Sequence, residues 1–154
     1  MKAMCRRILS LLMIVAILAS FAGSVSAMEV EEFPQQGRAS AYFSLLHWDL
    51  APLGNGKLEV YAKAWATGYM TKLGVSSVVI YEKLPNATSY SPVYTYNSYT
   101  CSFLYGTNVT SYTFNPTYTK AVPGAQYYSS TAFYAENSSG HETIYKYAPV
   151  ITAT

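Results

Sequence analysis

The sequence predicts an all-β fold, a seven-stranded antiparallel immunoglobulin-like β-sandwich that spans residues 39–154 as a single domain. Three observations lead to this prediction. Apolar and polar residues alternate over several short segments, Pro, Gly and Asn separate these segments, and nothing after residue 27 has the 3.6-residue period of an amphipathic helix.

The first two strands are expected at residues 41–50 and 57–67, on either side of a turn in APLGNGK. The second, KLEVYAKAWAT, alternates over its whole length. Its apolar side is formed by Leu58, Val60, Ala62, Ala64 and Ala66. Tyr61 and Trp65 therefore fall on the opposite, solvent-facing side. Ala, Lys, Glu and Leu favour a helix here, but eleven alternating positions outweigh that propensity.

Five further strands follow from β-branched and aromatic segments that end at turn residues. They are residues 75–84, 93–100, 109–114, 127–135 and 142–147, the last two joined by ENSSGH.

The segment PGAQYYSSTAFYAENSSG resembles the penultimate strand and following turn of fibronectin type III and immunoglobulin-like domains. The resemblance implies that Tyr127 is a corner tyrosine, with a buried ring and a hydroxyl that bonds to nearby backbone. The inward face would then consist of Tyr127, Ser129, Thr131, Phe133 and Ala135. A shift of one residue would instead place Tyr128, Ala132 and Tyr134 inside, and both registers remain open.

The whole chain resembles a family of small secreted proteins of Gram-positive bacteria whose function is uncharacterised. The resemblance rests on the order of LEVYAKAWAT, KLGVSSVVIYE, PGAQYY and NSSGHET after a signal peptide. Members of that family typically carry Tyr-Arg where this chain has Tyr127 and Tyr128. The resemblance implies export but no particular activity.

Residues 1–27 have the order of a signal peptide: three basic residues, an apolar run and small residues before Met28. The alternative is a membrane anchor, but the apolar run covers only 14 residues, 8–21, and a membrane-spanning helix needs about 20. We therefore expect a secreted, extracellular protein with no transmembrane anchor after cleavage. Residues 28–38 are expected to form a polar lead-in.

Removal of residues 1–27 takes three of the ten basic residues and none of the eight acidic ones, so the net charge changes from +2 to −1. The remaining chain has no basic patch, which argues against nucleic acid as a partner. Because Cys101 is then the only cysteine, no internal disulfide can form.

The sequence predicts no enzyme, metal site or cofactor. Cys101, His47, His141 and Asp49 could supply a thiol nucleophile, a base and an orienting group, but no activating motif surrounds Cys101. The two histidines lack the spacing of metal ligands. Carboxylates for glycoside cleavage are expected at strand ends or on outer faces, namely Glu59, Glu82, Glu136 and Glu142.

Aromatic side chains on solvent-facing strand surfaces are the candidate ligand-binding residues. They are Tyr61 and Trp65 on one sheet, and Tyr81, Tyr128 and Tyr134 on the other, with Tyr94 or Tyr96 beside them. Such rings offer large contact area at low entropy cost, although cross-strand pairing alone also favours them. We predict a non-enzymatic binding or surface-interaction module for glycan or protein. The alternative is a self-associating structural protein of the cell envelope.

Overall fold

The structure is a computed structural model, and it describes residues 40–154. Within this range the chain is all-β, with antiparallel pairing throughout. The strands are β1 (Phe43–Gly54), β2 (Lys57–Met70), β3 (Lys72–Lys83), β4 (Ser91–Tyr96), β5 (Tyr105–Gly106), β6 (Val109–Phe114), β7 (Thr117–Tyr118), β8 (Gln126–Asn137), β9 (Gly140–Tyr147) and β10 (Ile151–Thr152). The predicted signal peptide, residues 1–27, and the lead-in, residues 28–38, lie outside the described residues.

The prediction of seven strands is corrected to ten. Each predicted range overlaps a strand, and residues 109–114 match β6 at both ends. The three additional strands, β5, β7 and β10, are two residues long, and each pairs with residues near the end of a longer strand. Segments this short show no alternation, so their sequence does not indicate a strand.

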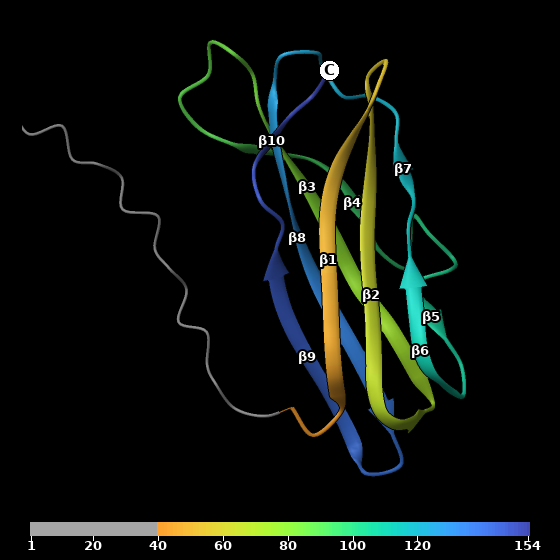
Figure 1. The fold of residues 1–154 in the computed structure, drawn as a ribbon. Helices are drawn as coiled ribbons and strands as arrows, with labels where there is room; N and C mark the ends of the chain where they lie inside the picture. The colour runs from red at the N-terminus through yellow and green to blue at the C-terminus, as the bar shows by residue number, and fades with distance from the viewer. Residues whose placement is uncertain (1–39) are drawn as a thin grey trace, which may run out of the picture. The chain divides into compact units, whose positions relative to one another are not determined.

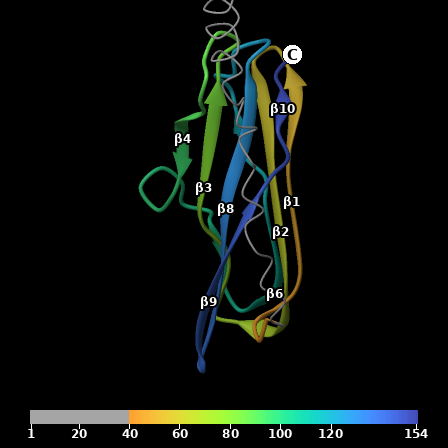
Figure 2. The ribbon, with the colours of Figure 1, turned by 90° about the vertical axis from the view of Figure 1, so that its left-hand side faces the viewer.

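The strands form two sheets that face each other (Figures 1 and 2). The first sheet has the order β1-β2-β6, with β7 also paired to β2. The second has the order β10-β8-β3-β4, with β9 paired to β8 and β5 paired to β3. We call the face of each sheet that points away from the other sheet its outer face.

The β1–β2 hairpin turns at Gly54, Asn55 and Gly56, all of which have positive φ. Glycine adopts this conformation without steric cost, and asparagine tolerates it better than most residues. The predicted alternation in β2 follows this turn: Leu58, Val60, Ala62 and Ala64 are buried, and Ala66 is partly buried.

Burial in β8 decides between the two registers that the sequence left open. Tyr127, Ser129, Thr131, Phe133 and Ala135 are all at most 1% exposed. The inward face implied by the immunoglobulin-like resemblance is therefore confirmed. The shifted register is wrong, because Tyr128 and Tyr134 are only partly buried, although Ala132 is buried as well.

The Tyr127 hydroxyl makes two hydrogen bonds inside the fold. It accepts one from the backbone N–H of Val122 at 2.8 Å, and it donates one to the Glu82 carboxylate. Burial, followed by the bond to Glu82, raises the pKa of Tyr127 well above its usual value. The protonated phenol thus connects β8 to β3 through Glu82, and to the loop that precedes β8 through Val122.

We expect the protein to lose stability steeply above about pH 10. Burial raises the pKa of Tyr96 from 10.0 to about 12, and the pKa of Tyr127 is also raised. Between the unfolded and folded pKa values the unfolded chain holds fewer protons, so the free energy of unfolding falls by about 1.4 kcal/mol per pH unit for each such tyrosine. Urea unfolding at a series of pH values measures this. A constant stability from pH 10 to pH 12 would contradict it.

Candidate functional site

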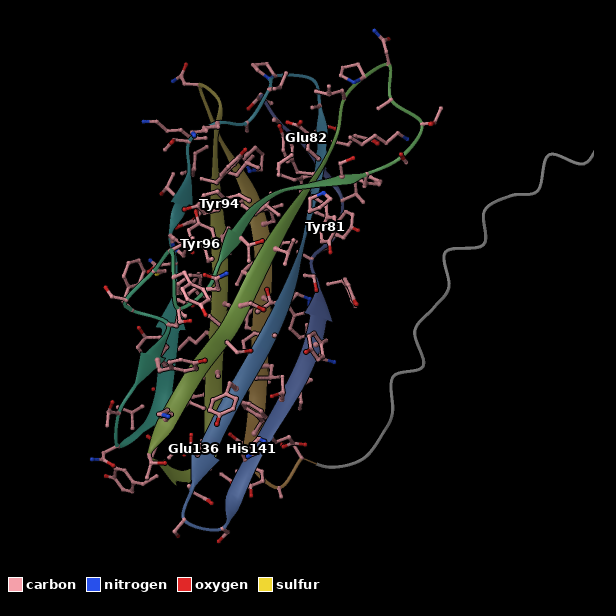
Figure 3. All side chains as sticks on the ribbon, turned by 180° about the vertical axis from the view of Figure 1, so that it is seen from behind. Tyr81, Glu82, Tyr94, Tyr96, Glu136 and His141 are labelled. Carbon is pink, nitrogen blue, oxygen red and sulfur yellow. The ribbon has the colours of Figure 1, made fainter. Side chains whose placement is uncertain are left out.

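The outer face of the second sheet carries a cluster of three tyrosines, Tyr81, Tyr90 and Tyr128, which we call the tyrosine cluster. Tyr81 on β3 pairs with Tyr128 on β8 in the strand register. Their rings stack with centroids 4.6 Å apart and an interplanar angle of 3°. Tyr90, from the loop before β4, meets Tyr128 edge-on at 4.9 Å. Figure 3 views the molecule from behind and shows Tyr81 in the upper half of the second sheet.

Two polar side chains hold Tyr90 in place. Its hydroxyl donates a hydrogen bond to Gln126 Oε1 at 3.2 Å, and the Lys83 ammonium lies 5.7 Å from its ring centroid. Lys83 and Gln126 are also directly paired between β3 and β8. The strand ends therefore fix the position of a side chain that comes from a loop.

A hollow of about 250 Å³ adjoins the tyrosine cluster. It is lined by Lys83, Leu84, Pro85, Gly124, Gln126 and Thr152. Because Lys83 and Gln126 line the hollow and also contact Tyr90, the hollow lies next to the tyrosine cluster. The Lys83 ammonium and the Gln126 amide thus lie beside Tyr90, and Thr152 lines the same hollow.

Within the tyrosine cluster, Tyr128 has a pKa above the usual value for a phenol. Burial raises the pKa of Tyr128, and the neighbouring hydroxyls of Tyr81, Tyr147 and Tyr90 raise it further. The Tyr128 hydroxyl is accordingly a hydrogen-bond donor as well as an acceptor at neutral pH.

Tyr134 shares the outer face but belongs to a second cluster near the other end of β8. Its ring stacks on His141 at 5.8 Å and meets Tyr105 edge-on at 5.5 Å. Its hydroxyl donates to Glu136 Oε2 at 2.7 Å, and the Lys72 ammonium lies 3.3 Å from the same oxygen. Figure 3 shows Glu136 and His141 far along the sheet from Tyr81.

The contacts of this second cluster shift two pKa values in opposite directions. The bond to Glu136, followed by burial, raises the pKa of Tyr134 to about 12. The bonds from Tyr134 and Lys72 lower the pKa of Glu136. This cluster is held by its own internal contacts, so Tyr134 does not join Tyr81 and Tyr128 in one site.

The expectation that Tyr94 or Tyr96 stands beside Tyr81 is wrong. The β3–β4 register pairs Tyr94 with Ile80 and Tyr96 with Val78, and both of those partners are buried. Both tyrosines consequently point into the sandwich, where the Tyr96 ring packs against Phe114 at 5.6 Å.

Tyr61 and Trp65 lie on the outer face of the first sheet, as predicted, and are only partly buried. Tyr61 packs against His47 with ring centroids 5.1 Å apart, and the Lys63 ammonium lies 4.4 Å above the Trp65 ring. They are on the other layer of the sandwich from the tyrosine cluster. The five predicted residues thus belong to three separate places.

The groups considered for catalysis do not come together. Cys101 is buried, while His47 packs on Tyr61 in the first sheet and His141 on Tyr134 in the second. Within residues 40–154, no three His, Cys, Asp or Glu side chains are placed to hold a metal ion.

Sequence reasoning missed Tyr90, Tyr145 and Tyr147. Tyr90 lies in a loop, and no pattern in the sequence indicates its position. Tyr145 and Tyr147 are 64% and 45% exposed on β9, and the alternation in HETIYKY could have placed them on the outer face.

The chain matches no protein-family model and no curated protein. The resemblance to small secreted proteins of Gram-positive bacteria therefore stays a prediction. No helix within residues 40–154 has the length and apolar character needed to cross a membrane.

Proposed function

We propose that this protein is a secreted, non-enzymatic binding module that recognises an extracellular glycan through the tyrosine cluster. The observation that carries the proposal is the stacked pair of Tyr81 and Tyr128, with Tyr90 against its edge and a polar hollow beside it. A protein partner is the second class of ligand that such a surface fits.

Glycan suits this arrangement for a chemical reason. A pyranose ring has apolar C–H faces and a rim of hydroxyls, so it binds where aromatic rings stand next to hydrogen-bonding groups. Here Gln126, Lys83 and Thr152 supply those groups from the hollow. The Tyr128 hydroxyl, whose pKa is raised by burial and by its neighbouring tyrosines, supplies another.

Secretion is part of the proposal, and its support is in the sequence. Residues 1–27 combine basic, apolar and small-residue segments in the order of a signal peptide. An extracellular glycan would be within reach of a protein exported in this way.

We also propose that the sandwich is immunoglobulin-like. Two features support this. In the two sheets, with orders β1-β2-β6 and β9-β8-β3-β4, the connection between the second and third strands crosses from one sheet to the other. In addition, the Tyr127 hydroxyl bonds to backbone five residues earlier, as a corner tyrosine does.

A glycan and cell-wall-polymer array tests the binding proposal. We expect the protein to bind one class of polymer, and we expect the Tyr81→Ser, Tyr128→Ser variant to bind it at least tenfold more weakly, a loss of about 1.4 kcal/mol. Tyr134→Ser and Tyr61→Ser are matched controls, because each removes an outward tyrosine from a different place. Both should bind normally.

Two outcomes would count against this function. If the unaltered protein binds no glycan on the array, the ligand class is wrong and protein partners become the leading candidates. If the controls lose as much affinity as the double variant, the tyrosine cluster is not the site.

A further inference from the structure

Strand β9 lies at an edge of the second sheet. It pairs with β8 from Gly140 to Tyr147 without a register shift, and within residues 40–154 no strand pairs with its other side. At the opposite edge of the same sheet, β4 is shorter, contains Pro92 and has an irregular register with β3. An unpaired regular edge is a template for adding another strand, and β9 is the better template of the two.

The ladder fixes which backbone groups of β9 point outward. The N–H of Ala148 donates to Ser129 O at 2.9 Å, so even-numbered residues bond to β8. In an antiparallel pair such bonds occur at every second residue, and odd-numbered residues consequently direct their N–H and C=O groups away from β8. The Tyr147 carbonyl agrees with this, because it accepts a hydrogen bond from Trp48 Nε1 at 2.8 Å. Thr143 and Tyr145 therefore offer their backbone groups to a neighbour.

The charges on β9 are self-complementary in a register that uses these groups. Glu142 and Lys146 lie two residues either side of Ile144, on the same face of the strand. If two copies pair antiparallel about Ile144, Thr143 lies opposite the partner's Tyr145, which keeps odd residues bonded to odd residues. The same register sets Glu142 opposite the partner's Lys146, and Lys146 opposite the partner's Glu142. Opposite charges in directly facing positions stabilise a strand pair.

Both charged side chains are already held in position by contacts within the protein. Ser40 Oγ donates to Glu142 Oε2 at 2.5 Å, and the Lys146 ammonium lies 5.0 Å from the Trp48 ring centroid. Among residues 40–154, no other hydrogen bond or ion pair occupies Glu142 Oε1 or the N–H groups of the Lys146 ammonium, so these groups can bind a partner.

We propose that the protein forms a symmetric dimer through β9, in which the second sheets of two copies join into one continuous antiparallel sheet. The partner is a second copy of this chain, paired about Ile144. The dimer goes beyond the binding function and does not depend on it. It gives the self-associating alternative a specific surface, and it would place the tyrosine clusters of two copies on one continuous sheet, where a polymer could engage both.

Sedimentation equilibrium of the protein over a range of concentrations tests the dimer. We expect reversible dimerisation. Glu142→Lys and Lys146→Glu should each weaken it about tenfold or more, because each creates two like-charge pairs across the symmetric interface. The combined variant should restore dimerisation to within about threefold of the original, as the two opposite-charge pairs are re-formed with their positions exchanged.

Thr143→Pro provides a test that does not depend on charge. Its missing N–H is one that points outward, so the bonds to β8 remain, and proline is tolerated on edge strands in this orientation. We expect a folded monomer with a melting temperature close to that of the unaltered protein. The proposal is overturned if the unaltered protein stays monomeric at concentrations up to about 1 mM. A dissociation constant of about 1 mM corresponds to a binding free energy of about 4 kcal/mol. The proposal is equally overturned by a dimer that persists in Thr143→Pro, or by an exchange of charges that fails to restore dimerisation.

Discussion

Replacing Gly74 with alanine is expected to lower the free energy of unfolding by about 3 kcal/mol. A Cβ atom at this position would lie 2.1 Å from the backbone oxygen of Leu104 and 3.0 Å from the Cα of Tyr105. Backbone atoms cannot turn aside as a flexible side chain can. The segment that carries β5 would have to move away, and that movement would break the hydrogen bond from Val75 N to Leu104 O.

Gly68→Ala is the matched control for this change. Gly68 also lies within a strand, β2, but a Cβ atom there would meet nothing within 4 Å. We expect Gly68→Ala to raise the free energy of unfolding by less than about 1 kcal/mol, because alanine restricts the unfolded chain. Equilibrium urea unfolding measures both variants. Equal losses would mean that a general cost of replacing strand glycines, and not the contact with Leu104, causes the effect.

The sequence predicted the parts of the fold that depend on local alternation. In β2 and β8 every second side chain faces the core, so the pattern in the sequence is enough to assign the faces of Val60, Tyr61, Tyr127 and Tyr128. The direction of Tyr94 and Tyr96 could not be assigned in this way. It depends on which residues of β3 lie opposite them, and an irregularity between Ile80 and Tyr81 alters that register.

The candidate site was also predictable only in part, because it depends on the register between strands. Tyr81 and Tyr128 could be placed on one face, but their direct stacking follows from the β3–β8 register. Tyr134 lies on that face too, yet it is six residues further along β8 and contacts a different set of side chains. The contribution of Tyr90 depends on how the loop before β4 folds back onto Gln126. Contacts between segments distant in sequence determine the site, and alternation within one strand does not contain them.

Tyr127→Phe is expected to lower the free energy of unfolding by about 2 kcal/mol while leaving the fold intact. The ring is fully buried and phenylalanine preserves its packing. The lost hydroxyl, however, leaves the Val122 N–H without its acceptor and the Glu82 carboxylate without its donor. Tyr118→Phe is the control, because that ring is also buried, packs on Tyr127 at 6.5 Å, and makes no hydrogen bond through its hydroxyl to any described residue. It should cost less than about 1 kcal/mol.

A double-mutant cycle with Glu82→Ala separates the two bonds of the Tyr127 hydroxyl. If the bond to Glu82 matters, Tyr127→Phe should cost about 1 kcal/mol less in the Glu82→Ala background than in the original protein. The remaining cost then belongs to Val122. The pH dependence gives an independent check, since burial and the bond to Glu82 raise the pKa of Tyr127. Without this phenol, the loss of stability above pH 10 should be shallower by about 1.4 kcal/mol per pH unit. An unchanged slope would mean that Tyr127 does not titrate differently in the folded and unfolded states, and that its hydroxyl does not hold the corner of β8.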